Sequence, residues 1–237
     1  MSFQTKALVI SSRDSKDSDK EVTLLTLEKG RIYAKFKGVK NQKSKLKAGK
    51  EVFTFGDFSV EEGKSGLIVT GVNIIENFYE ISQNIESYFE ACQILDLLKK
   101  VPIDENNVDL FLSTIKALKA LNCQKTQKNI VFFKFLIDFF ENHGFKFDFA
   151  RCSSCNAKLL GKRYINPDIG EIVCPNCKQN TYIEIDEKIV SAINILKNTN
   201  FDNLNSVKLG QIVSNELLSF LLKNFEWCFG EKIKILN

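Results

Sequence analysis

Several residue types that commonly carry chemistry are scarce in this chain of 237 residues, which has one histidine, one methionine, one tryptophan and three prolines. With His143 as the only imidazole, most acid-base and nucleophilic schemes that rely on histidine are excluded. The sequence contains neither a phosphate-binding P-loop nor a glycine-rich dinucleotide turn. These absences leave few of the common catalytic arrangements open to the chain.

Long apolar runs are also missing. Residues 1–6 are followed by only four apolar residues, which is too few for a secretory signal. No run approaches the roughly 18 apolar residues of a membrane span. We therefore expect a cytoplasmic protein with no membrane partner, whose thiols are reduced.

Cysteine is the most informative residue that is present. Four of the seven cysteines form two Cys-x-x-Cys pairs, with 18 residues between the pairs. These are Cys152, Cys155, Cys174 and Cys177. The spacing is typical of a zinc ribbon, because a two-residue gap lets both thiolates of a pair face one ion. Disulfides or a redox dithiol would need a setting that a cytoplasmic chain does not supply.

Four thiolates close the coordination shell of zinc and leave no position for a substrate. We therefore predict one structural Zn²⁺ per chain, which supplies folding free energy to a segment with little core of its own. Cys92, Cys123 and Cys228 lie in apolar helical patterns and are predicted to be buried, inert thiols.

Positive charge is concentrated in one segment. Residues 29–50 contain nine Lys or Arg and no acid, which leaves 24 basic and 29 acidic residues elsewhere. The net charge of +4 thus divides into +9 for the segment and −5 for the remainder. Such a patch indicates a polyanionic partner, although a solvated lysine-rich strand and loop stays open as the alternative.

The first 78 residues have the composition of short strands. Strands are predicted at residues 6–10, 21–27, 31–39, 51–60 and 67–76. Five such strands suggest a small OB-fold β-barrel, a fold that often binds single-stranded nucleic acid. The third strand should direct Ile32, Ala34 and Phe36 into the core. Its other face carries Arg31, Tyr33, Lys35 and Lys37, which suits a stacked base and its phosphates. A cross-strand packing role for Tyr33 stays open.

After residue 78 the apolar period becomes helical. A first helix carries apolar residues from Ile81 to Leu95, Pro102 ends it and Asp104 opens the next helix. A central helix is predicted at about 126–143, and two more at about 186–197 and 207–229. The fold class is thus α+β and multidomain: an OB-fold at 1–79, then a helical domain at 80–237 with an inserted zinc ribbon at about 149–182. The leucine stripe of the last helix is assigned to the core, with a partner groove left open.

The order of these parts resembles a known family. The string ALVISSRDSKDSDKEVTLLTLEKGRIYAKFKGVKNQKSKL is similar to the beginning of RecO, the bacterial recombination mediator family. The matching features are Asp19 before VTLLT, then Gly30, then a strand that runs into Lys37-Gly38. A phenylalanine-rich helix ending at His143-Gly144, followed by CSSC and GEIVCPNC, resembles the family's helical domain and ribbon.

The resemblance implies a DNA repair protein that is not an enzyme and is cytoplasmic and nucleoid-associated. Such a protein binds single- and double-stranded DNA and anneals complementary strands. It also implies action with RecR to load RecA onto DNA covered by single-strand-binding protein, and docking on the acidic C-terminal tail of that protein. It assigns DNA contacts to Arg31, Tyr33, Lys35, Lys37, Lys40, Lys43, Lys45 and Lys47. Val39-Lys40 stands where many relatives have arginine, and lysine is a point charge, which disfavours sequence-specific reading.

Two other functions are kept as alternatives. A metal-dependent nuclease would use carboxylates such as Asp17, Asp19, Glu61 and Glu62, although these lie in turn-like segments. An RNA-binding or translation-associated protein is the other alternative, because OB-folds and ribbons occur in many such proteins. The last two helices, with Lys223 near Leu222 and Phe225, offer a candidate groove for the acidic tail.

Overall fold

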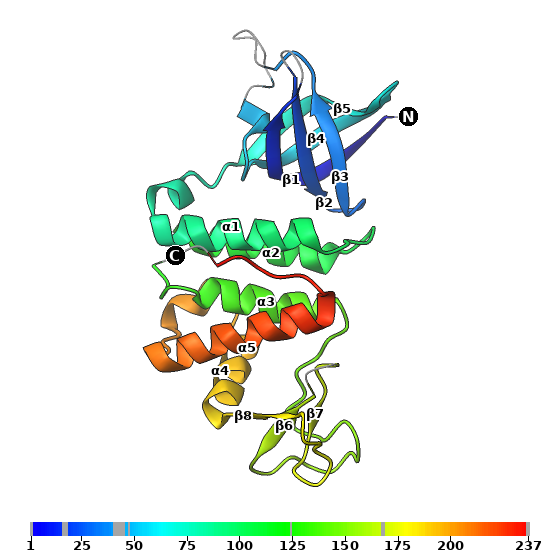
Figure 1. Ribbon diagram of the computed structural model, residues 1–237. Coiled ribbons are helices and arrows are strands. Elements are labelled where there is room, and N and C mark those ends of the chain that lie inside the picture. Colours follow the sequence, from blue (N-terminus) through cyan, green and yellow to red (C-terminus); the bar gives the residue numbers. More distant parts are fainter. Residues whose placement is uncertain are drawn as a thin grey trace.

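The computed structural model describes residues 2–15, 19–39, 46, 48–123, 125–166 and 169–235. Figure 1 shows a β-barrel at one end, a group of helices in the middle and a small three-stranded sheet at the other end. The predicted α+β organisation, with the barrel first and the cysteine-bearing segment inserted among the helices, is confirmed.

The barrel contains five strands. They are β1 (Ser2–Asp14), β2 (Lys20–Thr26), β3 (Arg31–Phe36), β4 (Phe55–Gly63) and β5 (Gly66–Glu76). Their order around the closed barrel is β1-β2-β3-β5-β4, with β4 also paired to β1. The β3 and β5 strands run parallel, and the other neighbours are antiparallel. This is the Greek-key OB-fold that the sequence predicts.

The alternation of side chains fills the barrel interior. Ala34 and Phe36 are buried there, and Ile32 packs against the same cluster, as predicted for β3. The bounds of three strands differ from the predicted ones by several residues. The first strand is Ser2–Asp14 rather than 6–10, because its pairing with β4 starts at Ser2 and its pairing with β2 continues to Asp14. The third strand ends at Phe36, because Gly38 turns the chain with φ 60°. The fourth begins at Phe55, because Phe53 in the preceding turn has φ 72°.

Five α-helices and two 3₁₀ helices follow within the described chain. They are η2 (Tyr79–Gln83), α1 (Ile85–Lys100), α2 (Val108–Cys123), α3 (Ile130–Asn142), α4 (Glu187–Asn198), η3 (Phe201–Ser206) and α5 (Gln211–Phe229). The first predicted helix is interrupted at Asn84, whose side chain accepts a hydrogen bond from Ser87 N and so caps α1. Asp104 does not open α2; Asn107 Oδ1 accepts from Leu110 N at its start. The last helix begins at Gln211 rather than at 207.

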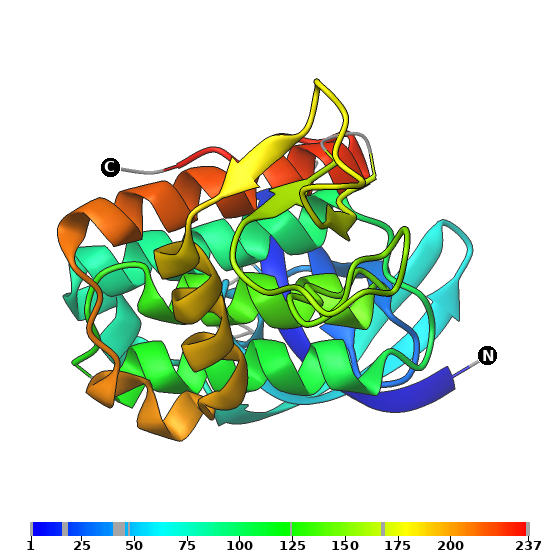
Figure 2. The same ribbon diagram turned by 90° about the horizontal axis from the view of Figure 1, so that it is seen from below.

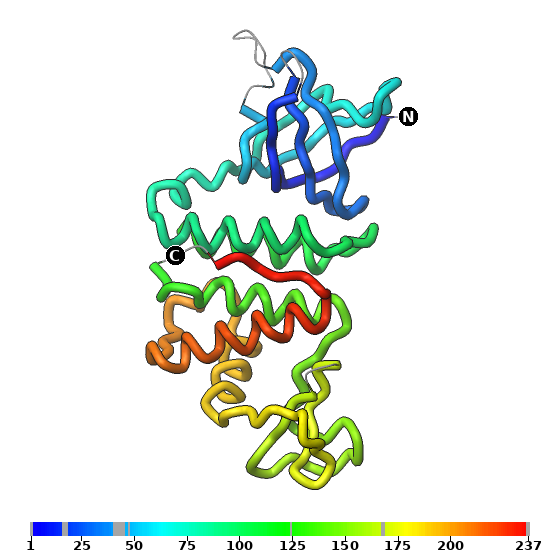
Figure 3. The backbone as a smooth tube through the Cα atoms, viewed as in Figure 1, coloured from blue at the N-terminus to red at the C-terminus, as the bar shows by residue number. Residues whose placement is uncertain are grey.

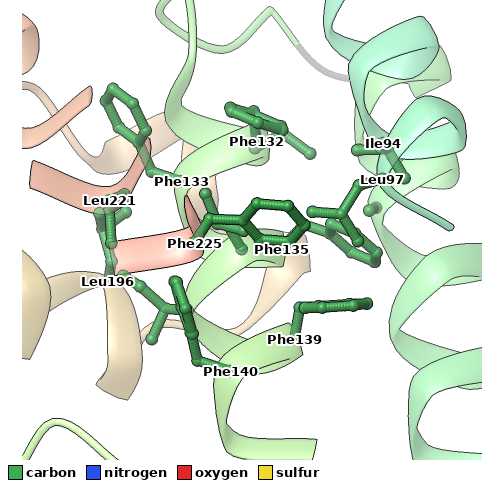
Figure 4. Close-up of a cluster of buried hydrophobic side chains, with 14 of the residues drawn as sticks. Ile94, Leu97, Phe132, Phe133, Phe135, Phe139, Phe140, Leu196, Leu221 and Phe225 are labelled. Carbon is green, nitrogen blue, oxygen red and sulfur yellow. The ribbon is translucent and has the colours of Figure 1, made fainter. Parts of the chain in front are cut away.

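Helix α3 lies at the centre of the helical core, as its apolar circumference predicts. Phenylalanines from α3 meet α1, α4 and α5, as Figure 4 shows for the cluster around Phe135, Phe139 and Phe225. The one lysine of α3, Lys134, is buried and pairs with Asp138 at 2.9 Å. Its ammonium also donates to the carbonyl of Lys197, which ties α3 to the end of α4.

The barrel and the helices share one apolar core. Leu8, Ile10 and Leu25 belong to the same buried cluster as α1 and α2, and the rings of Phe55 and Phe111 lie 6.1 Å apart. The β2–β3 turn meets the α1–α2 loop so closely that a side chain at Gly30 would come within 2.6 Å of a carbonyl oxygen. The barrel is therefore held against the helices by packing as well as by the chain connection.

The inserted segment forms a separate small sheet. Its strands are β6 (Arg163–Ile165), β7 (Ile172–Val173) and β8 (Ile183–Ile185), in the order β7-β6-β8. Seen from below in Figure 2, this sheet and α4 lie on the side of α3 away from the barrel. The tube in Figure 3 shows residues 231–235 returning between the α1–α2 pair and the α3–α5 pair. Among the described residues, no helix is long and apolar enough to cross a membrane.

Candidate nucleic-acid interface and metal centre

The outer face of β1, β2 and β3 brings two rows of side chains together. Pairing aligns Ser11 with Thr23 and Thr23 with Tyr33, which makes one row. The next row aligns Arg13 with Glu21 and Glu21 with Lys35. Both rows line a hollow of about 340 Å³ that the Ser65-Gly66 turn borders. We call this surface the barrel face.

Tyr33 is the prominent aromatic residue of the barrel face. The residue is 66% exposed, and its neighbours across β2 and β1 are the small hydroxyl residues Thr23 and Ser11. Small neighbours leave the flat side of the ring open to solvent, so an unpaired base could stack on it. The stacking role of Tyr33 and the cross-strand packing alternative both stay predictions.

The charges of the barrel face are organised around Glu21. Arg13 Nη2 lies 2.7 Å from Glu21 Oε2, and Lys35 Nζ lies 3.4 Å from Glu21 Oε1. The hydrogen bonds from Arg13 first, and from Lys35 second, lower the pKa of Glu21. Sequence reasoning missed Arg13 and Glu21, because both lie outside the basic segment and because the first strand was predicted to end at residue 10, before Arg13.

The other predicted DNA contacts have different positions. Lys37 is exposed in the turn after β3, and this turn is fixed where Gly38 N donates to Asp19 Oδ1 at 2.8 Å. Arg31 Nη1 donates to the carbonyls of Leu98, Lys99 and Val101 at the end of α1. One edge of the Arg31 guanidinium is therefore occupied by hydrogen bonds to the C-terminus of α1. The predictions for Lys40, Lys43, Lys45 and Lys47 lie outside the described residues.

The four predicted metal ligands converge. The Sγ atoms of the two cysteine pairs all lie within 4.8 Å of one another, and Cys155 Sγ is 3.8 Å from Cys174 Sγ. Within the described ranges, this is the one cluster of His, Cys, Asp or Glu side chains with the geometry to hold a metal ion. The nuclease carboxylates do not gather in such a cluster as far as they are described, and Asp17 lies outside the described part.

Tight turns position the cysteine thiols. Asn156 N donates to the carbonyl of Cys152, Cys177 N donates to the carbonyl of Cys174, and Asn156 adopts φ 58°. Burial alone would raise the pKa of Cys152, but backbone N–H groups of Cys155, Cys174 and Ser154 point at its sulfur and lower the pKa to about 6. The turns therefore favour the thiolate of Cys152, which is the form that binds a metal, while the neighbouring Cys155 raises the pKa of Cys177.

The three remaining cysteines are separate from this cluster. Cys92 and Cys228 are half-buried, and burial raises the pKa of Cys228 to about 11. The prediction of a buried thiol is wrong for Cys123, which is exposed because α2 ends there.

The predicted groove on the last helices is only partly open. Phe225 is fully buried in the core, so it offers no surface to a partner. Lys223 lines a hollow of about 250 Å³ together with Phe220 and Trp227. Three carboxylates line the same hollow, those of Glu184, Asp186 and Glu216. Its charge therefore does not favour an acidic tail.

A closed OB-type barrel packed on a helical domain, which carries four clustered cysteines that could hold a metal ion, defines the class of this protein. Within that class, the chain belongs to the RecO family. Residues 1–78 match the domain described as Recombination protein O N terminal, and residues 82–236 match Recombination protein O C terminal.

Curated relatives are similar over the whole chain. A protein of Clostridium novyi named DNA repair protein RecO is 27% identical over 99% of this chain and 92% of its own length. Proteins of the same name from Dehalococcoides mccartyi and Caldicellulosiruptor bescii are 27% and 25% identical over 99% of this chain, and over 93% and 96% of their own lengths.

Proposed function

We propose that this protein is a DNA repair and recombination mediator that binds single- and double-stranded DNA and anneals complementary strands without catalysing a chemical reaction. The observation that carries the proposal is the barrel face, where an exposed tyrosine lies beside Arg13 and Lys35 on an OB-type barrel. The names of the curated relatives support a role in DNA repair.

The barrel face suits binding that does not depend on base sequence. Its cations, with the lysines of residues 29–50, would neutralise phosphates and release counterions. Tyr33 would hold an unpaired base by stacking, which is tolerant of base identity. Annealing needs these two properties together, because phosphate repulsion must be screened while the pairing edges of the bases stay free.

Arg31 stays a predicted DNA contact with less support than its neighbours. Its Nη1 is engaged by three carbonyl groups of the helical domain. A role that positions the barrel on α1 accounts for these contacts. Lys35 and Lys37, on the same side of the chain, carry the proposal with Tyr33.

We further propose that the four cysteines hold one structural Zn²⁺. Zn–S bonds of about 2.3 Å in a tetrahedron require sulfurs about 3.8 Å apart. The separation of Cys155 and Cys174 equals this value, and no sulfur pair of the cluster exceeds 4.8 Å. The ion would stabilise the ribbon, and four thiolates would leave it no position for a substrate.

The proposal includes the partners that the RecO resemblance implies. These are RecR, the acidic tail of single-strand-binding protein and, indirectly, RecA, for a cytoplasmic protein associated with the nucleoid. The RNA-binding or translation-associated alternative has no support from the relatives' names, all of which specify DNA repair in the matches reported above. Equal affinity for DNA and RNA, without any annealing, would favour that alternative.

An annealing assay tests the proposal. Complementary strands coated with single-strand-binding protein are mixed with the wild type, with a barrel variant (Lys37→Glu with Lys40→Glu) or with a far-end control (Lys158→Glu with Lys188→Glu). We expect the wild type and the far-end control to accelerate annealing, and the barrel variant to lose most of that acceleration. Equal activity of all three proteins would place the DNA-binding surface elsewhere.

A further inference from the structure

Glu21 occupies an unusual position for an acidic residue on a surface proposed to bind DNA. It lies on β2 between Arg13 of β1 and Lys35 of β3, and it is bound by both. The Arg13 contact has two components, because Nε donates to Glu21 Oε2 at 2.9 Å while Nη2 lies 2.7 Å from the same oxygen. Ser15 Oγ donates to the other carboxylate oxygen at 3.3 Å.

These donors form a site for a tetrahedral or planar anion. A guanidinium that presents two N–H groups, an ammonium and a hydroxyl are the groups that bind a phosphate in proteins. The carboxylate of Glu21 therefore takes the place that a nucleic-acid phosphate would take. Its side chain is 29% exposed, so solvent and a ligand can reach it.

The rest of the hollow suits one nucleotide. Tyr33 lies two residues before Lys35 on the same face of β3, so an aromatic ring and a cation are neighbours. Ser11 and Thr23 add hydroxyl groups beside the ring. The volume of about 340 Å³ is at the small end of ligand sites and leaves no room for a base pair.

We propose that Glu21 is a built-in competitor for phosphate: a single unstacked nucleotide enters the hollow, its phosphate displaces the Glu21 carboxylate from Arg13 and Lys35, and its base stacks on Tyr33. This inference rests on the proposed function and adds to it a subsite, two further binding residues and a means of limiting affinity. Exposed ion pairs are weak, so the exchange is readily reversible. Reversible binding suits a protein that must release each strand once it has paired.

Neutralising Glu21 tests the proposal. Binding of a fluorescent single-stranded oligonucleotide is measured between 0.05 and 0.3 M salt for the wild type, Glu21→Gln and Asp57→Asn. Asp57 is the matched control, because it pairs with Lys6 at 2.7 Å on the barrel surface but does not line the hollow. Both variants remove one negative charge and release at least one cation.

We expect Glu21→Gln to bind about five- to tenfold more tightly than the wild type, with a log-log salt slope steeper by about 0.7 to 1.4, the change for one or two freed cations. Asp57→Asn should change affinity less than twofold. Adding Arg13→Gln to Glu21→Gln should remove most of the gain. Melting temperatures of all variants confirm that each one is folded.

The outcomes separate this inference from the proposed function. If the wild type binds with a clear salt slope but Glu21→Gln behaves like Asp57→Asn, Glu21 is not a competitor and the proposed function stands. Weaker binding by Glu21→Gln would mean that the carboxylate only orients Arg13 and Lys35, which overturns the inference. Absence of salt-dependent binding by the wild type would overturn the proposed function itself.

Discussion

At the scale of single residues, contacts within the protein decide which cations are available to a ligand. Alternation along β3 places Arg31, Tyr33 and Lys35 on one side of the strand, and the sequence alone gives them equal standing. The structure separates them, because Arg31 binds carbonyls 67 or more positions later in the chain. No local pattern could reveal that partner.

Replacing Arg31 with alanine distinguishes its two roles. We expect the free energy of unfolding to fall by about 1.5–3 kcal/mol, because hydrogen bonds from a charged group to the last carbonyls of α1 are lost. Urea unfolding measures this loss. A salt slope for DNA binding that drops by about 0.7 with unchanged stability would instead identify Arg31 as a phosphate contact.

Replacing Cys174 with serine tests the metal site at its buried side. We expect loss of bound zinc together with lower thermal stability, because one of four thiolates is missing. Metal analysis and a melting curve on the same sample report both effects. The matched control is Cys123→Ser, since Cys123 is an exposed thiol outside the cluster and should keep zinc and stability. A Cys174→Ser protein with one zinc per chain would refute the ligand assignment.

At the scale of elements, periodicity identified the strands and helices, while their ends depended on turns and caps. The central helix α3 was recognisable because it is apolar nearly all round. Its true start at Ile130 reflects a distant residue: Glu90 of α1 accepts hydrogen bonds from Asn129 N at 2.6 Å and Phe132 N at 3.2 Å. Because this cap comes from another helix, no local pattern in the sequence around residue 130 could reveal it.

The buried carboxyl of Glu90 should make stability depend on pH. Burial raises its pKa from 4.5 to about 7, against the opposing backbone hydrogen bonds from Asn129 and Phe132, with Glu86 and Lys128 as nearby charges. As pH rises from 4.5 to 7, the unfolded chain ionises freely while the folded protein retains the proton. Stability from this group is therefore present below pH 4.5 and falls by on the order of 3 kcal/mol through pH 7.

Urea unfolding at pH 5 and pH 8 measures this effect. In Glu90→Gln, which cannot ionise, the fall in stability between these two pH values should be smaller than in the wild type by roughly the contribution of Glu90. Glu216→Gln, an exposed position on α5 that does not influence Glu90, should keep the wild-type dependence. Equal pH dependence in wild type and Glu90→Gln would show that Glu90 does not titrate in this range.

At the scale of the whole molecule, the barrel and the small β6–β8 sheet of the cysteine-bearing segment lie at opposite ends of the helical core (Figure 1). The strand-like composition of the first 78 residues predicted the barrel, and the cysteine spacing predicted the cysteine cluster at the other end. They could not predict that the barrel shares a core with α1 and α2, because that packing joins residues such as Phe55 and Phe111 across the chain. Nor could they predict the Arg13–Glu21–Lys35 arrangement, which depends on the register of three strands.

The central claim is that single-stranded DNA binds the barrel through its phosphates, and the salt dependence of binding tests it most directly. If about five phosphates are contacted, the log-log slope of affinity against salt should be roughly −3.5 for the wild type. The barrel variant, Lys37→Glu with Lys40→Glu, should give about −2, and the far-end control, Lys158→Glu with Lys188→Glu, should keep the wild-type slope. An unchanged slope in the barrel variant, with a reduced slope in the far-end control, would contradict the account.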